Sequence, residues 1–551
     1  MLQLLLGGSG SGKTTLLYQR IRARAEKGEK SILLVPEQFT SSTEGRIYRE
    51  LGDALSGMVE SFSFTSLAEK ILSTEGGAAV QTLSDAGRAV LVRRALEELQ
   101  DNVHYYHRHR RSAAFCQMAA QTIDELKSAG LSGQQLAQLA GACGAESGKL
   151  SELALIFQGY ETLLARSGMD PSDRLELAGA RLEEALARHS LPEFLRDRAV
   201  FIDEFDTFNA PKKRLLGALL AALPSVTVAL CDDGAPLLPG DLSLFSGAKQ
   251  VAAQLRQLAR KNGAEVAVPQ LLRKDLRHRN APGLAAVAEL LETGSCTADA
   301  PAGEVRLFAA PSREEEARAA AGAIRRLMRQ GVRCGKIAVV CRDIAKYRAA
   351  IRYEFRMAEI PLYCDEPTTP EFSAPATAVR ALLEIARGAD LTENLTTLAK
   401  TGLCALSEEQ VCALENYAYT WAPTAAAWRE KFERSPKGFG EQELTEEDLR
   451  NREQAEYARA LLVGAVDAFR AKVRGVNAEA ISRAVYFCLK TLGAEEQQAA
   501  QVKAIRAGRG IPAAEEAARE WNVVMGLLNE MAHLLGEQTV TVAEYEDLFG
   551  L

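Results

Sequence analysis

The chain has 551 residues, of which 47% are hydrophobic, 25% charged and 6% aromatic, close to the average for soluble globular proteins. This composition excludes a disordered or fibrous chain, and the length predicts three or four domains. The 66 Lys and Arg against 73 Asp and Glu give a net charge of −7, which argues against a general nucleic-acid coat but not against DNA held in a local channel.

Apolar segments alternate with helical patterns over the first 77 residues. The run LQLLLGG opens the chain, and a helix is predicted from Lys13 to about Lys27. The strand SILLVP, a helix from about Ser42, the strand VESFSF and a further helix follow. This alternation is typical of a parallel α/β sheet.

Strand patterns disappear between residues 78 and 195, where apolar residues recur at spacings of three and four, as in AGRAVLVRRALEEL. This spacing predicts an all-helical insertion. Strands return at AVFIDEF and VTVALCD. The apolar stretch from Leu215 to Cys231 is interrupted by Pro224, Ser225 and Thr227, so it predicts a helix followed by a strand rather than a membrane span.

A second α/β segment is predicted from residue 303. It comprises the strand EVRLFAA, a charged helix over 313–330, the strand KIAVVCRD and a helix ending at about Arg356. From residue 372 the pattern is helical again, with turns near 435–442 and 508–512. The final TVTVAEYEDLFGL predicts a strand or turn leading into a helix, and since no polar tail follows, we expect the sequence to be part of a longer protein.

The ten cysteines are scattered singly, without a CxxC pair or a short Cys/His spacing. They predict neither a disulfide framework nor a zinc site and favour reduced thiols in a cytoplasm. The N-terminal apolar run lacks a basic region before it and is followed at once by glycines, so it is interpreted as a buried strand rather than a signal peptide. We therefore expect a soluble, cytoplasmic protein that does not contact a membrane.

A phosphate-binding motif lies between the first strand and the first helix. It fits G-x-x-x-x-G-K-[ST], and its predicted nucleotide-binding residues are Gly7, Gly8, Ser9, Gly10, Ser11, Gly12, Lys13 and Thr14. The glycines let backbone N–H groups surround phosphates at a helix N-terminus. Lys13 is expected to reach the β- and γ-phosphates and Thr14 to bind Mg²⁺. A glycine-rich turn with an incidental lysine is the less favoured alternative.

A nucleotide site of this class also needs a carboxylate at the end of a neighbouring strand, to hold the metal and orient water. The segment VFIDE supplies Asp203 and Glu204. Asp203 is predicted to bind Mg²⁺, and Glu204 to be the catalytic base for the attacking water. Acidic residues are common at sheet edges, so this interpretation depends on the phosphate loop.

The segments VPEQFTSSTE and ESFSFTSLAEKIL also follow predicted strands. Their aromatic and hydroxyl side chains could face a single DNA strand at the sheet edge, and the predicted DNA-binding residues are Phe39, Thr40, Phe62, Phe64 and Ser66. The alternative is that each phenylalanine belongs to the core.

The segment HYYHRHRR, from His104 to Arg111, gathers three histidines, three arginines and two tyrosines. It could contact DNA phosphates and stack on bases. A solvated basic surface or a subunit interface is the favoured alternative, and a metal site is the least favoured because no nearby Cys, Asp or Glu completes a ligand set.

The order of these motifs resembles one protein family. The phosphate loop, VPEQFT, SFSFTSLAEKIL, FIDEFDTF, RDIAKYRAAIRYEF with IPLYCDEP, and LAKTGLCALSEEQVCALENYAYTW follow each other as in the N-terminal half of AddB, also called RexB. Members of this family are the B subunits of bacterial two-subunit helicase-nucleases that process double-strand DNA breaks. The resemblance spans essentially the whole chain, and the segments at 343–365 and 400–421 are the most specific to the family.

The resemblance implies an α/β protein with a superfamily 1 (UvrD-like) helicase fold, in which two RecA-like P-loop domains each carry a helical insertion. The implied parts are a first RecA-like domain over 1–77, its helical insertion over 78–195, the rest of that domain with the metal carboxylate over 196–302, a second RecA-like domain from 303–371, and its helical insertion over 372–551.

The resemblance also implies ATP and Mg²⁺ as cofactors, DNA as a partner and an AddA (RexA)-type subunit as the main motor. In the family the B subunit adds a C-terminal nuclease domain and helps to recognise the Chi sequence. The nuclease domain, with its iron–sulfur cysteines, is expected beyond Leu551, so none of the ten cysteines is assigned to a cluster.

Departures from superfamily 1 motors point to weakened motor function. Motors carry D-E-x-Q-D, whose glutamine senses the γ-phosphate, whereas Asp206 and Asn209 stand in this region. No segment with the glutamine that recognises adenine in motors precedes the phosphate loop. VTVALCDDG stands where motors carry a G-D-x-x-Q sensor. The arginine that the second domain of motors brings to the nucleotide is expected past the C-terminus. A nucleotide- and DNA-binding subunit is favoured over an autonomous translocase and over a scaffold with a vestigial phosphate loop.

Overall fold

The computed structural model describes residues 1–77, 82–110, 112–142, 144, 147–295, 304–364, 372–389, 391–440, 443–536 and 539–550. The chain divides into two compact units, one formed by Met1–Lys274 with Pro370–Leu551 and the other by Asp275–Thr369. Among the described helices, none is long and apolar enough to cross a membrane.

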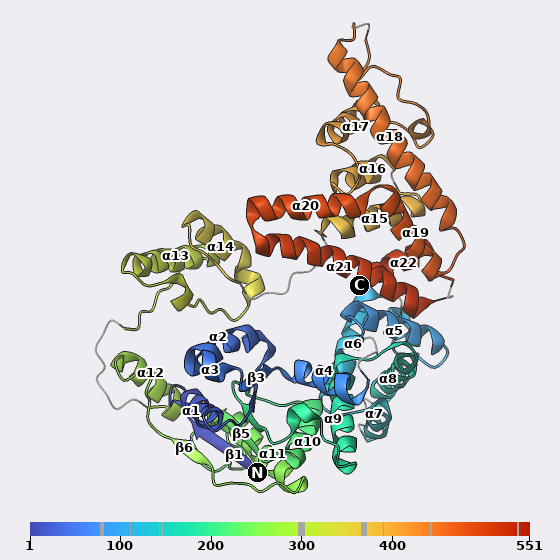
Figure 1. The fold of residues 1–551 in the computed structure, drawn as a ribbon. Coiled ribbons are helices and arrows are strands. Elements are labelled where there is room, and N and C mark those ends of the chain that lie inside the picture. Colours follow the sequence, from blue (N-terminus) through green and yellow to red (C-terminus); the bar gives the residue numbers. More distant parts are fainter. Residues whose placement is uncertain are drawn as a thin grey trace. The chain divides into compact units, whose positions relative to one another are not determined.

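The larger unit is built around a six-stranded parallel sheet with the order β3-β2-β4-β5-β1-β6. Figure 1 labels β1, β3, β5 and β6 of this sheet. Its strands are β1 (Leu2–Gly7), β2 (Ser31–Leu34), β3 (Val59–Phe62), β4 (Ala199–Ile202), β5 (Ser225–Cys231) and β6 (Gln270–Leu272). The first five confirm predicted strands, whereas β6 was not predicted. Because the strands are parallel, the loops after β1, β2, β4 and β5 emerge at one edge.

Helices cover both faces of this sheet, in the α/β arrangement that its strand pattern predicted. Residues alternate between the faces: Leu4 and Leu6 of β1 belong to one core cluster and Leu5 to the other. The face with Leu5 packs against α1 (Lys13–Ala25) and α2 (Thr40–Leu51). The opposite face packs against α4 (Phe64–Glu75), α9 (Pro171–Ala187), α10 (Ala210–Ala222) and α11 (Ser246–Lys261); the short α3 spans Asp53–Ser56.

The helical segments on either side of residues 275–369 share one hydrophobic core. The first contains α5 (Asp85–Glu98), α6 (Ala113–Ser128), α7 (Gly133–Ala140) and α8 (Ser147–Ser167). The second contains α15 (Ala374–Arg387), α16 (Leu391–Lys400), α17 (Glu408–Trp421), α18 (Glu446–Lys472), α19 (Ala478–Thr491), α20 (Ala494–Arg509), α21 (Ile511–Leu535) and α22 (Val542–Phe549).

A buried carboxylate joins these two helical segments. Glu530 of α21 is 5% exposed and accepts hydrogen bonds from the backbone N–H and the hydroxyl of Ser84, which caps α5. Predicted as insertions of two different domains, the helices therefore belong to the same compact unit.

The smaller unit contains α12 (Pro282–Thr293), α13 (Arg313–Arg329) and α14 (Ile344–Met357). Its core is small and is formed mainly by Ala321 and Ile324 of α13 against Ile351 and Phe355 of α14. The two predicted helices are confirmed within a few residues.

The two strands predicted in this unit are wrong for the described residues. EVRLFAA, from residue 304, and KIAVVCRD, from residue 336, lie outside any strand, and Leu307, Phe308 and Val340 are exposed. A strand forms only when its backbone groups pair with a neighbour, and two isolated segments give at best a marginal sheet. A complete second RecA-like sheet is therefore not seen in the described part of this unit.

Candidate nucleotide site

The predicted phosphate loop joins β1 to α1 at the edge where the parallel strands end (Figure 1). Gly10 and Gly12 have φ values of 79° and 89°, a backbone conformation that residues with a Cβ rarely adopt. Gly12 directly precedes the first turn of α1. The glycines of the motif thus form the turn that brings the chain to the N-terminus of α1, where unpaired N–H groups favour anions.

Close packing explains why the loop begins with glycine. A Cβ at Gly7 would lie 2.4 Å from the Ser11 hydroxyl oxygen and 2.6 Å from the carbonyl oxygen of Leu272 in β6. Ser11 is 6% exposed, and its hydroxyl has no hydrogen-bond partner among the described residues. An unsatisfied buried hydroxyl costs free energy, so a ligand that supplied a partner would be favoured; the loop fits a phosphate group.

The Lys13 side chain folds back onto the phosphate loop. The ammonium nitrogen donates hydrogen bonds to the carbonyl oxygens of Gly7 and Gly8, each at 2.8 Å. The positive charge is therefore held beside the loop, half-buried, and part of these bonds would be exchanged for phosphate oxygens on binding.

Asp203 and Thr14 are brought together by the sheet, although 188 positions separate them. Asp203 follows β4 and is 6% exposed. Burial raises the pKa of this carboxyl, while hydrogen bonds from the Thr14 hydroxyl and from the backbone N–H of Glu204, the latter at 3.0 Å, oppose that rise. A hydroxyl and a carboxylate side by side are the protein ligands that Mg²⁺ takes next to phosphates.

Glu204 is exposed and has a φ of 67°. This left-handed conformation is uncommon for a residue with a long side chain, and strained backbone of this kind clusters at functional sites. No group of three or more His, Cys, Asp or Glu side chains able to hold a metal occurs among the described residues.

Near the position where a sensor glutamine was expected, Asn209 has a structural role. Asn209 caps α10, its side-chain oxygen accepting a hydrogen bond from the N–H of Lys212 at 3.1 Å. Asp206 is exposed. Phe205 and Phe208 are buried, so this segment anchors the β4–α10 loop in the core.

A cavity of about 220 Å³ lies beside Thr14 and the two carboxylates. Several of its lining residues were not predicted as site residues, among them Tyr18 of α1 and Arg46 and Arg49 of α2. The Arg46 guanidinium lies 4.9 Å from the centroid of the Tyr18 ring, and burial raises the Tyr18 pKa to about 12. The only sequence signal for Arg46 was its place in the helix after VPEQFT.

Asp232 is a further acidic residue that the sequence did not single out. It follows β5, which lies between β1 and β4, and its backbone N–H donates to the carbonyl oxygen of Gly7 at 3.2 Å. The side chain is 2% exposed and accepts a hydrogen bond from the N–H of Gly234 at 2.7 Å. Burial raises its pKa.

The predicted DNA-binding residues do not form one surface. Phe64 is 2% exposed and packs edge-on against Phe205 and Phe208, with ring centroids 5.2 and 5.9 Å away. As a base-stacking residue, Phe64 is therefore a wrong prediction, because its ring faces the core. Phe62 is partly buried against the same cluster.

The other members of that set remain predictions. Phe39 is half-buried and lines the cavity with Arg46. The hydroxyl of Thr40 donates to the carbonyl oxygen of Glu37 at 2.9 Å. Ser66 is exposed and closes a capping box with Ser63 at the start of α4, a local role that accounts for its position without DNA.

The basic segment from His104 is held in place by hydrogen bonds of its backbone rather than by contacts of its charged side chains. The Glu152 carboxylate accepts hydrogen bonds of 2.8 to 3.2 Å from the N–H groups of His104, Tyr105 and Tyr106. The histidine and Tyr105 side chains are exposed, and Arg111 lies outside the described residues. This geometry fits the solvated basic surface better than a ligand site.

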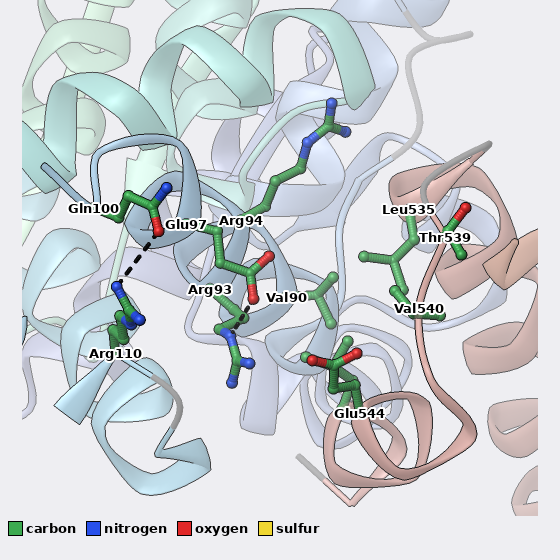
Figure 2. Close-up of a pocket in the computed structure, with 11 residues that line it drawn as sticks. Val90, Arg93, Arg94, Glu97, Gln100, Arg110, Leu535, Thr539, Val540 and Glu544 are labelled. Atoms are coloured by element: carbon green, nitrogen blue, oxygen red, sulfur yellow. Dashed lines mark hydrogen bonds and ion pairs between the residues drawn. The ribbon is translucent and has the colours of Figure 1, made fainter. Parts of the chain in front are cut away.

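A second polar cavity, also about 220 Å³, lies where α5 meets the segment from α21 to α22 (Figure 2). Its arginines are already engaged: the Arg93 Nε lies 2.7 Å from Glu97 and the Arg94 Nη1 donates to the Leu534 carbonyl at 3.0 Å. The cavity therefore belongs to the contact between the two helical segments.

Comparisons with known proteins agree with the resemblance noted in the sequence. A family profile described as ADDB, N-terminal matches residues 4–288. The chain is 30% identical over 575 aligned positions to the B subunit of the ATP-dependent helicase/deoxyribonuclease of Desulforudis audaxviator, covering 99% of this chain and 48% of that protein. For the protein of the same name from Moorella thermoacetica the values are 30% over 571 positions, 99% and 48%.

The corresponding protein of Heliobacterium modesticaldum is 29% identical over 575 positions, which cover 99% of this chain and 46% of that protein. The chain thus spans about half the length of the curated relatives that it matches. Because the family profile covers more than half of the 551 residues and these relatives align along almost the whole chain, the resemblance is confirmed: the chain belongs to the AddB N-terminal family.

Proposed function

We propose that this chain binds a magnesium nucleotide at its phosphate loop and is the helicase-like, DNA-binding part of the B subunit of a two-subunit helicase-nuclease that processes double-strand breaks. One observation carries the nucleotide site: the Thr14 hydroxyl and the Asp203 carboxylate meet beside a glycine loop whose buried Ser11 hydroxyl has no hydrogen-bond partner among the described residues. Two segments far apart in the sequence converge there, which a glycine-rich turn with an incidental lysine does not require.

The residues divide the work of binding. N–H groups of the loop and of the first turn of α1 surround phosphate oxygens, and Lys13 adds a charge-assisted bond in place of its present carbonyl partners. Thr14 and Asp203 would hold Mg²⁺, which supplies neutralisation of phosphate charge when bound. Glu204 would accept a proton from an attacking water.

The larger role draws on the relatives. They are named as B subunits of an ATP-dependent helicase/deoxyribonuclease, which supports ATP as the nucleotide, DNA as the substrate and an A-type subunit as the partner. The superfamily 1 arrangement that we propose with this role rests on the order of the sequence motifs. We also propose that coupling of hydrolysis to movement is weak in this chain. Only contacts that differ between the ATP and ADP states shift a conformational equilibrium, and Asn209 caps a helix where a sensor glutamine was sought.

Calorimetry with Mg-ATPγS tests the nucleotide site. Lys13→Ala is expected to weaken binding about 30- to 150-fold, equivalent to about 2–3 kcal/mol of phosphate contact. Lys27→Ala, which removes an exposed lysine just after α1, is the charge-matched control and should bind like the wild type. Equal affinity of the wild type and Lys13→Ala would refute the site.

A second assay separates this proposal from an autonomous translocase. ATP turnover by the chain alone, titrated with single-stranded DNA, is expected to show little stimulation. Strong stimulation that is abolished by Glu204→Gln would favour the translocase. Co-expression with an A-type subunit, followed by unwinding assays with and without Lys13→Ala, then tests the role within the complex.

A further inference from the structure

A cationic side chain faces the metal side of the candidate nucleotide site. Arg46 lines the cavity that Thr14, Asp203 and Glu204 also line. It comes from α2, whereas the other three come from α1 and from the loop after β4. The sheet order brings these elements together because β2, which leads into α2, pairs directly with β4.

The position of Arg46 is fixed by an aromatic ring. Its guanidinium lies 4.9 Å from the centroid of Tyr18, which is 5% exposed. A guanidinium over the face of a buried ring loses part of its freedom, and its N–H groups can bind a planar or tetrahedral anion. Arg46 is only half-buried, so a change at this position is not expected to open the core.

The cavity has the charge pattern of a site that gains an anion. Asp203 and Glu204 line it together with Arg46 and Arg49 of α2. A magnesium ion bound by Thr14 and Asp203 would give the cavity a net positive charge, which a further phosphate group would neutralise.

We propose that Arg46 binds the terminal phosphate of a nucleoside triphosphate and makes the site prefer triphosphate over diphosphate. This role rests on the proposed nucleotide binding. The loop, and Lys13 through the β-phosphate, hold groups that both nucleotides carry, whereas Arg46 contacts only the terminal phosphate of the triphosphate. Arg46 thereby distinguishes the triphosphate from the diphosphate. In superfamily 1 motors the γ-phosphate is sensed by the glutamine that this chain lacks.

The test compares two ligands in the whole chain by calorimetry: Mg-ATPγS and Mg-ADP. Arg46→Ala is expected to weaken ATPγS binding about tenfold or more, the size of one lost charge-assisted bond, while ADP binding changes by less than about twofold. Arg46→Lys keeps the charge but not the planar fork and should lose less than Arg46→Ala. Lys27→Ala, which removes an exposed charge elsewhere, should change neither affinity.

The outcomes distinguish this role from the proposed function. Selective loss of ATPγS affinity supports it, and intact ADP binding in the same sample shows that the variant is folded. Equal weakening of both ligands would assign Arg46 a merely structural role, and no change in either would remove it from the site; both results overturn the proposal and leave nucleotide binding standing. Failure of the wild type to bind either ligand would refute both proposals together.

Discussion

Two regions of this chain have similar α/β sequence patterns, but among the residues that the structure describes only one of them forms a sheet. LQLLLGG and KIAVVCRD are both apolar runs that precede helices. The first becomes β1, paired on both sides by β5 and β6, with Leu5 fully buried. In the second, Val340 is 91% exposed. The difference shows that an apolar alternation predicts a strand only where other strands are present to pair with it.

The pairing also decides where chemistry is possible. Parallel pairing of β1, β5 and β4 gathers Gly7, Asp232 and Asp203 at one edge of the sheet. In the unit Asp275–Thr369, the described residues contain no such edge, and its core consists of two helices. We therefore expect the two regions to respond differently to the same kinds of perturbation.

The largest contrast is expected in hydrogen exchange. Amides of β1 and β5 are bonded within the sheet core and should exchange at least about 1000-fold more slowly than those of residues 304–310 and 337–342, because exchange from a core strand requires large-scale unfolding. Mass spectrometry of peptic peptides measures this, with α13 as the internal reference for the smaller unit. Slow exchange at 337–342 would mean that this segment is a strand in solution.

The second largest contrast between the two regions is expected when an apolar side chain is truncated. Leu5→Ala removes a fully buried side chain from the sheet core and is expected to lower the free energy of unfolding by about 2–5 kcal/mol. Leu307→Ala alters a side chain that is wholly exposed and should change it by less than about 0.5 kcal/mol. Urea unfolding followed by far-UV circular dichroism compares them, and a large loss in Leu307→Ala would place that residue in a core.

Adding one methyl group to a glycine gives a smaller contrast. In Gly7→Ala the new Cβ would meet the Ser11 hydroxyl and the Leu272 carbonyl below 3 Å, so we expect a stability loss of about 1–3 kcal/mol and weaker nucleotide binding. Gly335→Ala has no atom within 4 Å of its new Cβ and should be neutral. Thermal unfolding and ATPγS titration measure both, and an unaltered Gly7→Ala would mean that the loop is less tightly packed than described.

The smallest expected effect is the change in stability when a buried carboxyl group is replaced by an amide, measured as a function of pH. Burial raises the Asp203 pKa, so the folded state binds its proton more tightly than the unfolded state and loses stability as the pH rises through the folded-state pKa. Without nucleotide and metal, Asp203→Asn should therefore be slightly more stable than the wild type at neutral pH and equal to it at the acidic end, while binding Mg-ATPγS more weakly.

The matched change in the other unit should have the opposite sign. Glu354 is 8% exposed and pairs with Arg318 at 3.1 Å. Glu354→Gln loses this pair and should lower stability slightly at neutral pH, by an amount that the exposure of Arg318 keeps small. Urea unfolding of the two variants over a series of pH values gives the comparison. If Glu354→Gln raised the stability instead, the ion pair with Arg318 would not compensate the free-energy cost of burying the Glu354 carboxylate.

Local patterns in the sequence were enough to predict much of the sheet and the phosphate loop. The glycines at positions 7–12 with Lys13 and Thr14 predict a loop conformation by themselves, because the demand for positive φ and close packing acts on neighbouring residues. The strand-and-helix periodicity of residues 1–77 and the helical periodicity of 372–550 are also local properties. The resemblance to AddB identified the family, which the comparisons confirm.

Tertiary structure decided everything that depends on partners far along the chain. It placed Arg46 and Asp232 beside the loop through the strand order, moved Phe64 into the core, and joined α5 to α21 through Ser84 and Glu530. It also left KIAVVCRD unpaired. Burial and strand pairing are set by which segments meet in space, and sequence spacing carries no direct record of that.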